Sequence, residues 1–256
     1  MSAIKSTKSA VTNISDAEHA IRIDLAAAYR LLAKFGMTDL IYTHISARVP
    51  GTHEQFLINP YGWLFDEITA SSLVKIDLDG NILDGPKNDV NRAGFVIHSA
   101  VHAARSDVEC VVHTHTKAGM AVAACRTGLL PVNQISMQFY NRVAYHDYEG
   151  ISLELDERER LVADLGGHDV MILRNHGLLT AGRSVASAFS LMFYLNRACE
   201  IQLAAQAMGE LVLPSDEVCE HAAQQFAHSC SETIGNEREW SALLRILDRD
   251  DAGYRQ

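Results

Sequence analysis

The chain has 256 residues, of which 48% are apolar, so it is long enough to bury a substantial core, and general disorder is excluded. It carries 32 Asp and Glu against 22 Lys and Arg, and the resulting net charge of −10 opposes binding to a phosphate backbone. No apolar run approaches the roughly 20 residues of a membrane span. We therefore expect a cytoplasmic protein whose partner is a small-molecule substrate, not nucleic acid or a membrane.

The N-terminal residues and the body of the chain differ in pattern. Residues 1–14 lack apolar periodicity and predict a flexible arm, whereas residues 15–256 predict a single α/β domain. Ser15 and Glu18 form a capping box that begins the first helix, and Gly36 ends it. The predicted strands cover residues 45–49, 55–59, 74–77, 82–83, 109–115 and 170–173. Further helices are expected over residues 93–105, 118–125, 156–165, 184–208, 216–228 and 237–247.

Three histidines stand out among the twelve in the chain. His113 and His115 lie two residues apart at the end of a predicted strand, where alternate side chains share a face, so both imidazoles can point at one ion. His176 ends a second apolar strand and precedes Gly177, which lets the backbone turn sharply. The first two histidines alone are slightly more typical of surface or core histidines that happen to be close than of a metal site. Adding the third favours a metal site, because three neutral nitrogens with an open fourth position are typical of catalytic zinc and also suit manganese.

These motifs resemble the class II aldolase/adducin family. The matching residues are His113-Thr114-His115 and Leu173-Arg174-Asn175-His176-Gly177, and the resemblance extends over residues 15–209. Residues 128–132 and 198–202 are similar to the adducin-like branch. The resemblance implies an α/β fold with three α/β/α layers and a largely antiparallel central sheet. It also implies zinc on the three histidines and a homotetramer with active sites between neighbouring subunits.

The sequence departs from the family where the aldolases carry their proton-transfer base. That base is a glutamate four residues before a histidine on the helix preceding the His-x-His strand. The matching histidine is His98, and the residue four positions earlier is Gly94. Glycine offers no group within hydrogen-bond reach of a substrate proton. The phosphate-cradle positions read Thr43-His44 and Arg92-Ala93, although residues 59–62 retain the look of a third cradle loop, so we do not expect a sugar-phosphate aldolase.

Several residues could replace the missing base, and each has a structural alternative. His44 titrates near neutrality, or it is a turn histidine bonded to the backbone. His98 lies one turn from Gly94 on the same helix face, or it is a core histidine. Arg92 could pair bidentately with a substrate carboxylate, or it begins a helix on a solvated face. The candidate site residues are His98, His44 and Arg92 as catalytic, Asn59, Asn91 and Gln134 as substrate-binding, and His113, His115 and His176 as metal ligands.

Two functions compete. In the first, a divalent metal, zinc or manganese, polarises an oxygen of a small oxyacid and stabilises the enolate formed by carbon–carbon cleavage. Decarboxylation generates that enolate directly and needs no base in that step. In the second, the chain is a non-catalytic adducin-like assembly or binding domain, which the missing base favours and the intact three-histidine set opposes. We expect a metal-dependent lyase acting on a small carboxylated or hydroxylated substrate.

Overall fold

A single sheet organises the chain. The computed structural model describes residues 14–85, 89–150, 156–230 and 237–256. Its strands are β1 (His44–Arg48), β2 (Gln55–Ile58), β3 (Val74–Asp77), β4 (Ile82–Asp84), β5 (Cys110–Thr114), β6 (Val143–His146), β7 (Val170–Leu173) and β8 (Gly177–Gly182). Within the described residues they form one sheet in the order β4-β3-β2-β1-β5-β8-β7-β6. Every neighbouring pair is antiparallel except β6 and β7, which confirms the expected largely antiparallel sheet.

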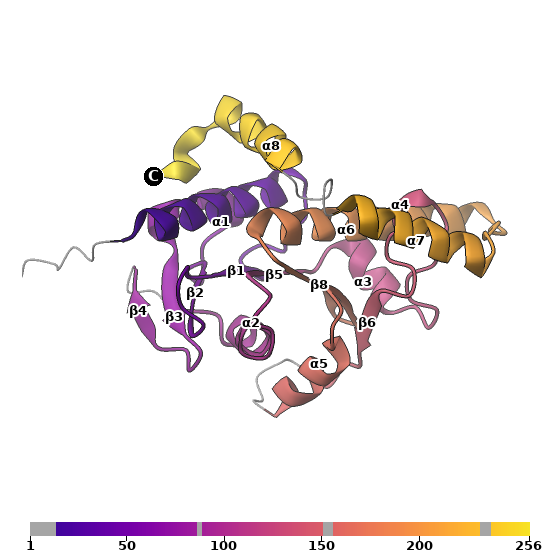
Figure 1. The fold of residues 1–256 in the computed structure, drawn as a ribbon, viewed down its shortest axis with the longest axis horizontal. Coiled ribbons are helices and arrows are strands. Elements are labelled where there is room, and N and C mark those ends of the chain that lie inside the picture. The colour runs from indigo at the N-terminus through magenta and orange to yellow at the C-terminus, as the bar shows by residue number, and fades with distance from the viewer. Residues whose placement is uncertain (1–13, 86–88, 151–155, 231–236) are drawn as a thin grey trace, which may run out of the picture.

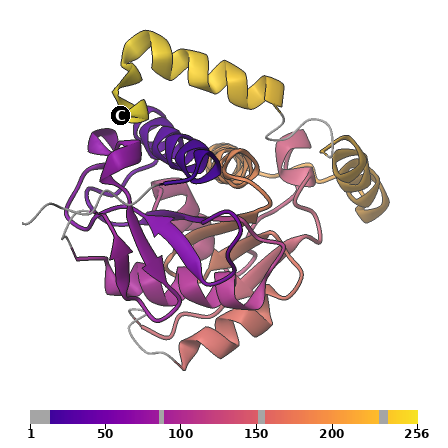
Figure 2. The ribbon, with the colours of Figure 1, turned by 60° about the vertical axis from the view of Figure 1, so that its left-hand side comes forward.

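Helices cover both faces of this sheet and complete the expected three layers (Figure 1). On one face lie α1 (Asp16–Lys34) and α6 (Val185–Met208), with α8 (Glu237–Asp250) packed outside α1. On the other face, α2 (Arg92–Ala104) and α5 (Glu157–Leu165) pack together. The remaining helical segments are α3 (Lys117–Ala123), α4 (Gln134–Met137), α7 (Asp216–Cys230), η1 (Phe65–Glu67), η2 (Ala70–Ser72) and η3 (Ala252–Arg255). Figure 2 shows that α7 stands to one side of these layers.

The predicted start of the first helix is right, but its capping differs from the prediction. The Ser15 hydroxyl accepts a hydrogen bond of 3.1 Å from the backbone N–H of Glu18, as expected of an N-cap. The Glu18 carboxylate does not close the box. It is buried and accepts hydrogen bonds from Arg22 (3.0 Å) and Lys75 (2.7 Å) instead. Because Lys75 lies on β3, this ion-pair cluster fastens α1 to the sheet.

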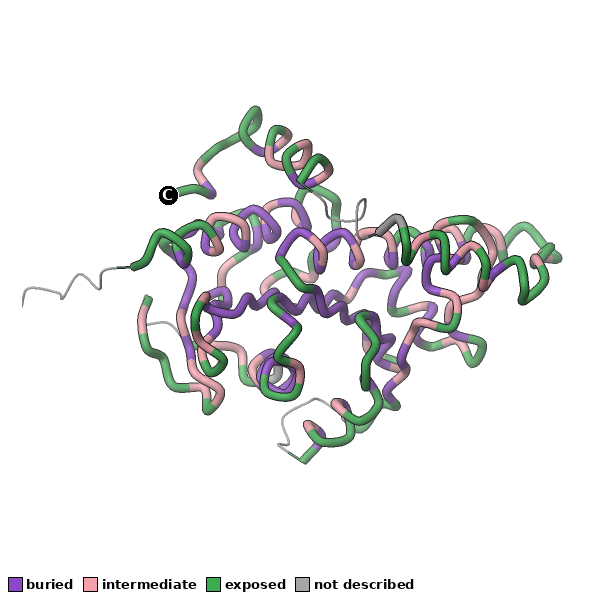
Figure 3. The backbone as a smooth tube through the Cα atoms, in the orientation of Figure 1, coloured by how far each residue is buried: buried purple, intermediate pink, exposed green. Residues whose placement is uncertain are grey.

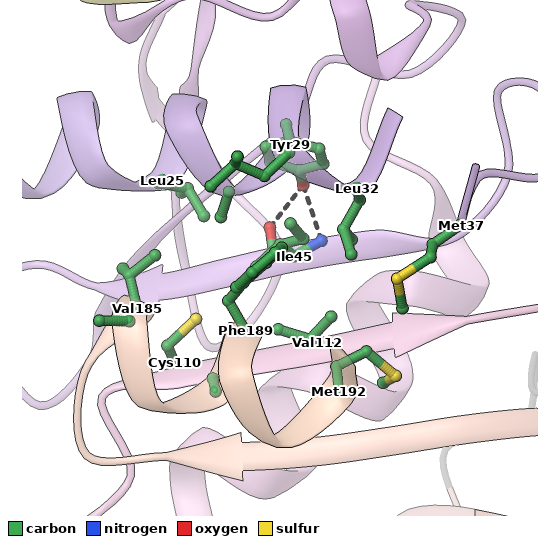
Figure 4. Close-up of a cluster of buried hydrophobic side chains, with 14 of the residues drawn as sticks. Leu25, Tyr29, Leu32, Met37, Ile45, Cys110, Val112, Val185, Phe189 and Met192 are labelled. Carbon is green, nitrogen blue, oxygen red and sulfur yellow. Dashed lines mark hydrogen bonds between the residues drawn. The ribbon is translucent and has the colours of Figure 1, made fainter. Parts of the chain in front are cut away.

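The main core lies between the sheet and the layer of α1 and α6. Leu25, Val112 and Phe189 are among the side chains that fill it, each no more than 1% exposed (Figure 4). Tyr29 ties α1 to β1: its hydroxyl accepts from the N–H of Ile45 at 2.8 Å and lies 2.5 Å from the carbonyl of the same residue. The central strands β1, β5 and β8 are buried along their length, whereas many residues of α7 and α8 are exposed (Figure 3). No helix in the described ranges has the length and apolar character to span a membrane.

Three local predictions differ from the structure or fall outside it. Residues 126–148, where the sequence predicts no helix or strand, contain α4 and strand β6, because β6 pairs with β7 from a distant part of the sequence. The predicted helix over residues 156–165 begins with a charged segment, yet Glu157 within it is only 7% exposed and its carboxylate lies 3.6 Å from the Nε2 of His146. The predicted arm, residues 1–14, lies outside the described residues apart from its last position.

Candidate metal centre

Three histidines converge where the ends of neighbouring strands meet. His113 lies on β5, His115 follows two residues later just beyond the strand, and His176 lies in the turn between β7 and β8. Because β8 lies between β5 and β7, that turn meets the end of β5. One ring nitrogen from each histidine lies within 4.8 Å of the other two. The structure therefore brings together the three residues that the sequence singled out as metal ligands.

Glycine at position 177 is needed for space, not for the turn. The positive φ falls on Asn175 (54°), a residue type that tolerates this conformation. A Cβ on Gly177 would lie 2.5 Å from the carbonyl oxygen of Thr114, 3.1 Å from Cδ2 of His115 and 3.3 Å from Cε1 of His113. The prediction that Gly177 makes the sharp turn is therefore wrong. Its missing side chain lets β8 approach the histidine pair.

Hydrogen bonds fix the tautomers of two of the histidines. Nδ1 of His113 lies 2.9 Å from the carbonyl oxygen of Leu178, and Nδ1 of His115 lies 2.9 Å from a carboxylate oxygen of Asp39. Both oxygens can only accept, so each Nδ1 carries a proton, and in the neutral ring each Nε2 presents a lone pair. The two Nε2 atoms are 2.9 Å apart. That separation is close to the roughly 3.3 Å expected between two nitrogens on one tetrahedral zinc ion, and a cation removes the conflict between the lone pairs.

Burial keeps the imidazoles of the centre in the form that binds metals. It lowers the pKa of His113 well below 6.5, and the neighbouring rings of His176, His115 and His44 act in the same direction. Burial also lowers the pKa of His176 to about 4, with His115 and His146 adding to the shift. Both rings are therefore neutral at pH 7 and offer lone pairs. The donor set fits a borderline-soft divalent ion such as zinc.

His44 fills the space beside Gly94. A Cβ on Gly94 would lie 2.6 Å from three atoms of the His44 ring. The same ring stacks on His113 with centroids 6.2 Å apart and meets His98 edge-on at 5.6 Å. Glycine within a helix costs about 1 kcal/mol relative to alanine, and here it makes room for an imidazole next to the three histidines.

The side-chain polar atoms of Thr43 and His44 are buried without partners among the described residues. No hydrogen-bond partner among the described residues contacts either ring nitrogen of His44 or the Oγ1 of Thr43. The interpretation of His44 as a turn histidine bonded to the backbone through its ring is thus wrong, and His44 instead begins β1. Thr43 has φ of 69°, which is a genuine outlier for a β-branched residue. Buried polar groups normally have hydrogen-bond partners. These side chains are therefore suited to bind a ligand or a water molecule.

His98 belongs to a separate, sealed pair. Its Nδ1 lies 2.7 Å from the hydroxyl of Ser46, and the same hydroxyl lies 2.8 Å from Nε2 of His102. The two imidazoles are at most 2% exposed, and burial lowers the pKa of each to about 3. The His98 side chain is also loosely linked to the centre through the ring of His44. These contacts favour the core alternative over a direct catalytic role for His98.

A cavity lies beside the start of α2. It has a volume of about 690 Å³ and is lined by Arg92, Asn91, Tyr61 and the ring of Phe95, among others. Arg92 is exposed and forms no hydrogen bond or ion pair with the described residues. None of the three histidines lines this cavity. The link between the two is α2 itself, because Gly94 touches His44 while its neighbours face the cavity.

The other two predicted substrate residues lie apart from the histidines. Asn59 is 4% exposed, and its amide oxygen accepts a 2.8 Å hydrogen bond from the Tyr29 hydroxyl, so it is held mainly as a structural residue. Gln134 is exposed at the start of α4, and no described contact joins it to the histidine centre. The sequence analysis missed Asp39. It lies 76 positions before His115 in the chain, and no motif connects the two.

Comparison with known proteins identifies relatives across most of the chain. The profile of the Class II Aldolase and Adducin N-terminal domain matches residues 23–203. An aldolase II superfamily protein from Pseudomonas syringae, known from its crystal structure, is 54% identical with a TM-score of 0.90, covering 95% of this chain and 98% of that one. The L-fuculose 1-phosphate aldolase from Glaciozyma antarctica PI12 is 26% identical with a TM-score of 0.84, covering 98% and 97%.

A relative named as an adducin matches over a shorter part of its own length. Alpha-adducin of Rattus norvegicus is 44% identical over 252 residues, which is 93% of this chain but 34% of the adducin. The similarity therefore concerns about one third of that protein. Relatives named as aldolases and relatives named as adducins thus both match more than nine tenths of this chain.

Proposed function

Because this chain belongs to the class II aldolase/adducin family, we propose that it is a metal-dependent lyase that cleaves a carbon–carbon bond of a small carboxylated or hydroxylated substrate. The observation that carries the proposal is the convergence of ring nitrogens from His113, His115 and His176, two of them with the Nε2 lone pair directed inward by fixed tautomers. A structural core needs no such arrangement, since unpaired lone pairs facing each other are unfavourable.

The histidine centre would hold one divalent ion, with zinc as the expected metal and manganese as the alternative. When bound, the ion supplies positive charge that stabilises an enolate or carboxylate oxygen. The chain's own residues keep that oxygen in a largely dry setting, because His113 and His44 are at most 5% exposed. Three neutral imidazoles leave the charge of a divalent ion largely uncompensated, which favours an anionic substrate.

Arg92 and Asn91 would bind the carboxylate of that substrate. The Arg92 guanidinium has no partner among the described residues, lines the cavity of about 690 Å³ and can pair bidentately with a carboxylate. Asp79 and Asp89 also line the cavity, so its charge is mixed, and a compact monocarboxylate fits it better than a highly charged phosphate ester. We infer that small oxyacids are better substrates than phosphorylated sugars.

His44 would be the polar group nearest the reacting atoms in place of a base at Gly94. Its two unpartnered nitrogens give it one donor and one acceptor for a bound substrate. Decarboxylation suits this arrangement, because loss of carbon dioxide forms the enolate without prior proton abstraction. Burial lowers the pKa of His44 well below 6.5, contrary to the expected titration near neutrality, so its ring is neutral at pH 7. His44 would then hold the water that supplies one proton to the enolate carbon. His98 would support His44 from behind and not touch the substrate.

The alternative is a non-catalytic assembly or binding domain. It is favoured by the 44% identity with alpha-adducin and by the glycine at position 94.

The proposed lyase would also be a homotetramer located in the cytoplasm. In support of assembly, apolar side chains are exposed around the junction of α6 and α7, namely Met208, Val212, Leu213 and Val218. Light scattering at micromolar concentration tests the tetramer, and a monomer mass contradicts it.

A substrate screen tests the proposed reaction. Zinc- or manganese-loaded protein is assayed with small 2-oxo and hydroxy acids and with a ketose 1-phosphate, and we expect turnover of an acid. Arg92→Ala should lower kcat/KM at least about tenfold through KM, whereas Arg126→Ala, another exposed arginine without described partners, should not. Cleavage of the ketose 1-phosphate that is undiminished in Arg92→Ala and His44→Ala contradicts the substrate class. No turnover of any acid or sugar at full metal occupancy supports the binding domain instead.

A further inference from the structure

The ring of His115 is held by a carboxylate from outside every predicted motif. Oδ2 of Asp39 lies 2.9 Å from Nδ1 of His115, and the two side chains are 42% and 21% exposed. Nδ1 of His113 is held by a backbone carbonyl, that of Leu178, in the equivalent position. Among the described residues, Asp39 is the only carboxylate that hydrogen-bonds one of the three histidines. The Nδ1 of His115 therefore faces a charged carboxylate, whereas the Nδ1 of His113 faces a neutral carbonyl.

A carboxylate behind an imidazole does more than a carbonyl. Both acceptors fix the ring orientation and leave Nε2 free, but the negative charge also raises the electron density at Nε2 and partly balances a bound cation. This matters in a centre whose other two candidate ligands are His113 and His176. Position 94, on the adjoining helix, is a glycine and adds no charge. Asp39 thus places a negative charge in direct contact with one of the three imidazoles.

The backbone around Asp39 is held in an unusual conformation. Asp39 pairs with Tyr42 in an isolated bridge, and the N–H of Tyr42 donates to the Asp39 carbonyl at 2.9 Å. Within this turn Leu40 has φ of 49° and Thr43 has φ of 69°. A left-handed conformation costs roughly 1–2 kcal/mol for a residue other than glycine. The strained turn holds Asp39 against His115 at one end and leads directly into His44 at the other.

We propose that Asp39 is a positioning residue of the metal centre: it holds His115 with Nε2 directed inward and supplies the negative charge that strengthens metal binding. The inference rests on the metal site of the proposed function. Asp39 does not touch the substrate. Its removal should therefore act through the ion, and the effect should be measurable without any assay of turnover.

Cobalt(II) binding to the full chain tests this role. Metal-free wild type, Asp39→Asn, Asp39→Glu and Asp39→Ala are titrated with cobalt, and the visible absorption bands and dissociation constants are recorded. Loss of a partner behind a ligand typically weakens metal affinity by about 10- to 100-fold. We expect that loss for Asp39→Asn and Asp39→Ala, together with a shifted visible spectrum, and partial recovery for Asp39→Glu. Asp66→Asn, an exposed aspartate on η1, serves as the control with the same change in net charge.

The outcomes separate this inference from the proposed function. Tight binding by wild type with unchanged affinity and spectrum in Asp39→Asn overturns the role of Asp39 and leaves the metal site intact. An equal loss in Asp66→Asn also overturns it, because the effect is then one of overall charge. Wild type that binds no cobalt overturns both the inference and the metal site. Circular dichroism and unfolding curves in the presence of chelator show whether the variants remain folded. If Asp39→Ala does not fold, Asp39→Asn and Asp39→Glu supply the test.

Discussion

Two groups of histidines lie close together on this sheet, and they are built in opposite ways. In the metal centre, His113 and His115 are fastened through Nδ1 to acceptors outside the group, so their Nε2 atoms face inward without a donor. In the sealed pair, Nδ1 of His98 and Nε2 of His102 share one hydroxyl, that of Ser46, while the other ring nitrogen of each histidine is buried without a partner in the described chain. The first group leaves a position between its ring nitrogens for a cation. In the second group, the Ser46 hydroxyl occupies the position between the two rings.

The difference shows what distinguishes a ligand histidine from a core histidine. Burial is not the criterion, because His113 and His98 are both at most 1% exposed and both have a strongly lowered pKa. The criterion is where the hydrogen bonds lead. Partners outside the group leave lone pairs inside it, whereas a shared partner inside uses them. His44, whose ring touches both groups and has no partner in the described chain, lies between the two.

The largest effect is expected from removing one ligand of the metal centre. His176→Ala should weaken zinc binding by on the order of 1,000-fold, about 4 kcal/mol, because it removes one of three nitrogens. The free energy of unfolding in the presence of chelator should change little, since His176 is only partly buried. Competition with a chromophoric chelator measures the affinity. Retention of zinc at wild-type affinity would remove His176 from the centre.

Truncation within the sealed pair should have the reverse pattern. His98→Ala leaves a cavity and an unpaired position beside Ser46, so the free energy of unfolding should fall by about 3 kcal/mol. Zinc affinity should stay within about threefold of wild type. Urea unfolding in chelator and the same competition assay provide both numbers. A large loss of zinc affinity with normal stability would place His98 in the metal centre and abolish the distinction between the groups.

The contact between Gly94 and His44 can be broken from either side. Gly94→Ala should destabilise the fold by about 2 kcal/mol, although alanine is the better helix former, because its Cβ would meet the His44 ring at 2.6 Å. In the double variant with His44→Ala, that loss should largely disappear. A double-mutant cycle from urea unfolding gives the coupling energy. Additive effects would mean that the two residues do not compete for the same space.

The pH dependence of stability should report the sealed pair. Burial lowers the pKa of His98 in the folded state to about 3, against an ordinary value of 6.5. Between pH 6.5 and 3, His98 therefore binds a proton in the unfolded chain but not in the folded chain. Stability is therefore full above pH 6.5 and is lost as the pH falls toward 3, by about 1 kcal/mol per pH unit for this histidine. His98→Gln should have a correspondingly shallower slope in chelator between pH 6 and 4. An unchanged slope would show that His98 does not resist protonation.

The sequence predicts the parts of the centre that depend on local spacing. The alternation of a strand puts His113 and His115 on one face, and the Asn-His-Gly turn supplies His176; these residues do come together. The helices and the main strands follow from periodicity in the same way. Contacts between distant segments were not accessible. Asp39 and the packing of His44 against Gly94 each join residues at least 50 positions apart, and β6 is a strand because of its neighbour β7.

Residue roles within the centre were harder to predict than its members. Gly177 has an ordinary φ, so its role in making room for the histidines depends on how closely β8 approaches β5. Asn59 fits a ligand loop by sequence, yet its amide oxygen is engaged by Tyr29 from α1. Such roles are set by which side chains meet in the folded chain. Spacing along one segment carries no information about them.

The central claim is that one ring nitrogen from each of His113, His115 and His176 binds the same metal ion. Crystals of the protein grown with zinc, measured at the zinc absorption edge, test it directly through anomalous diffraction. We predict one strong anomalous peak per chain, about 2.0–2.1 Å from Nε2 of His113 and of His115 and from one ring nitrogen of His176. A zinc-saturated crystal with no peak among these three residues, or with a peak on the Ser46 side at His98 and His102, would contradict the account.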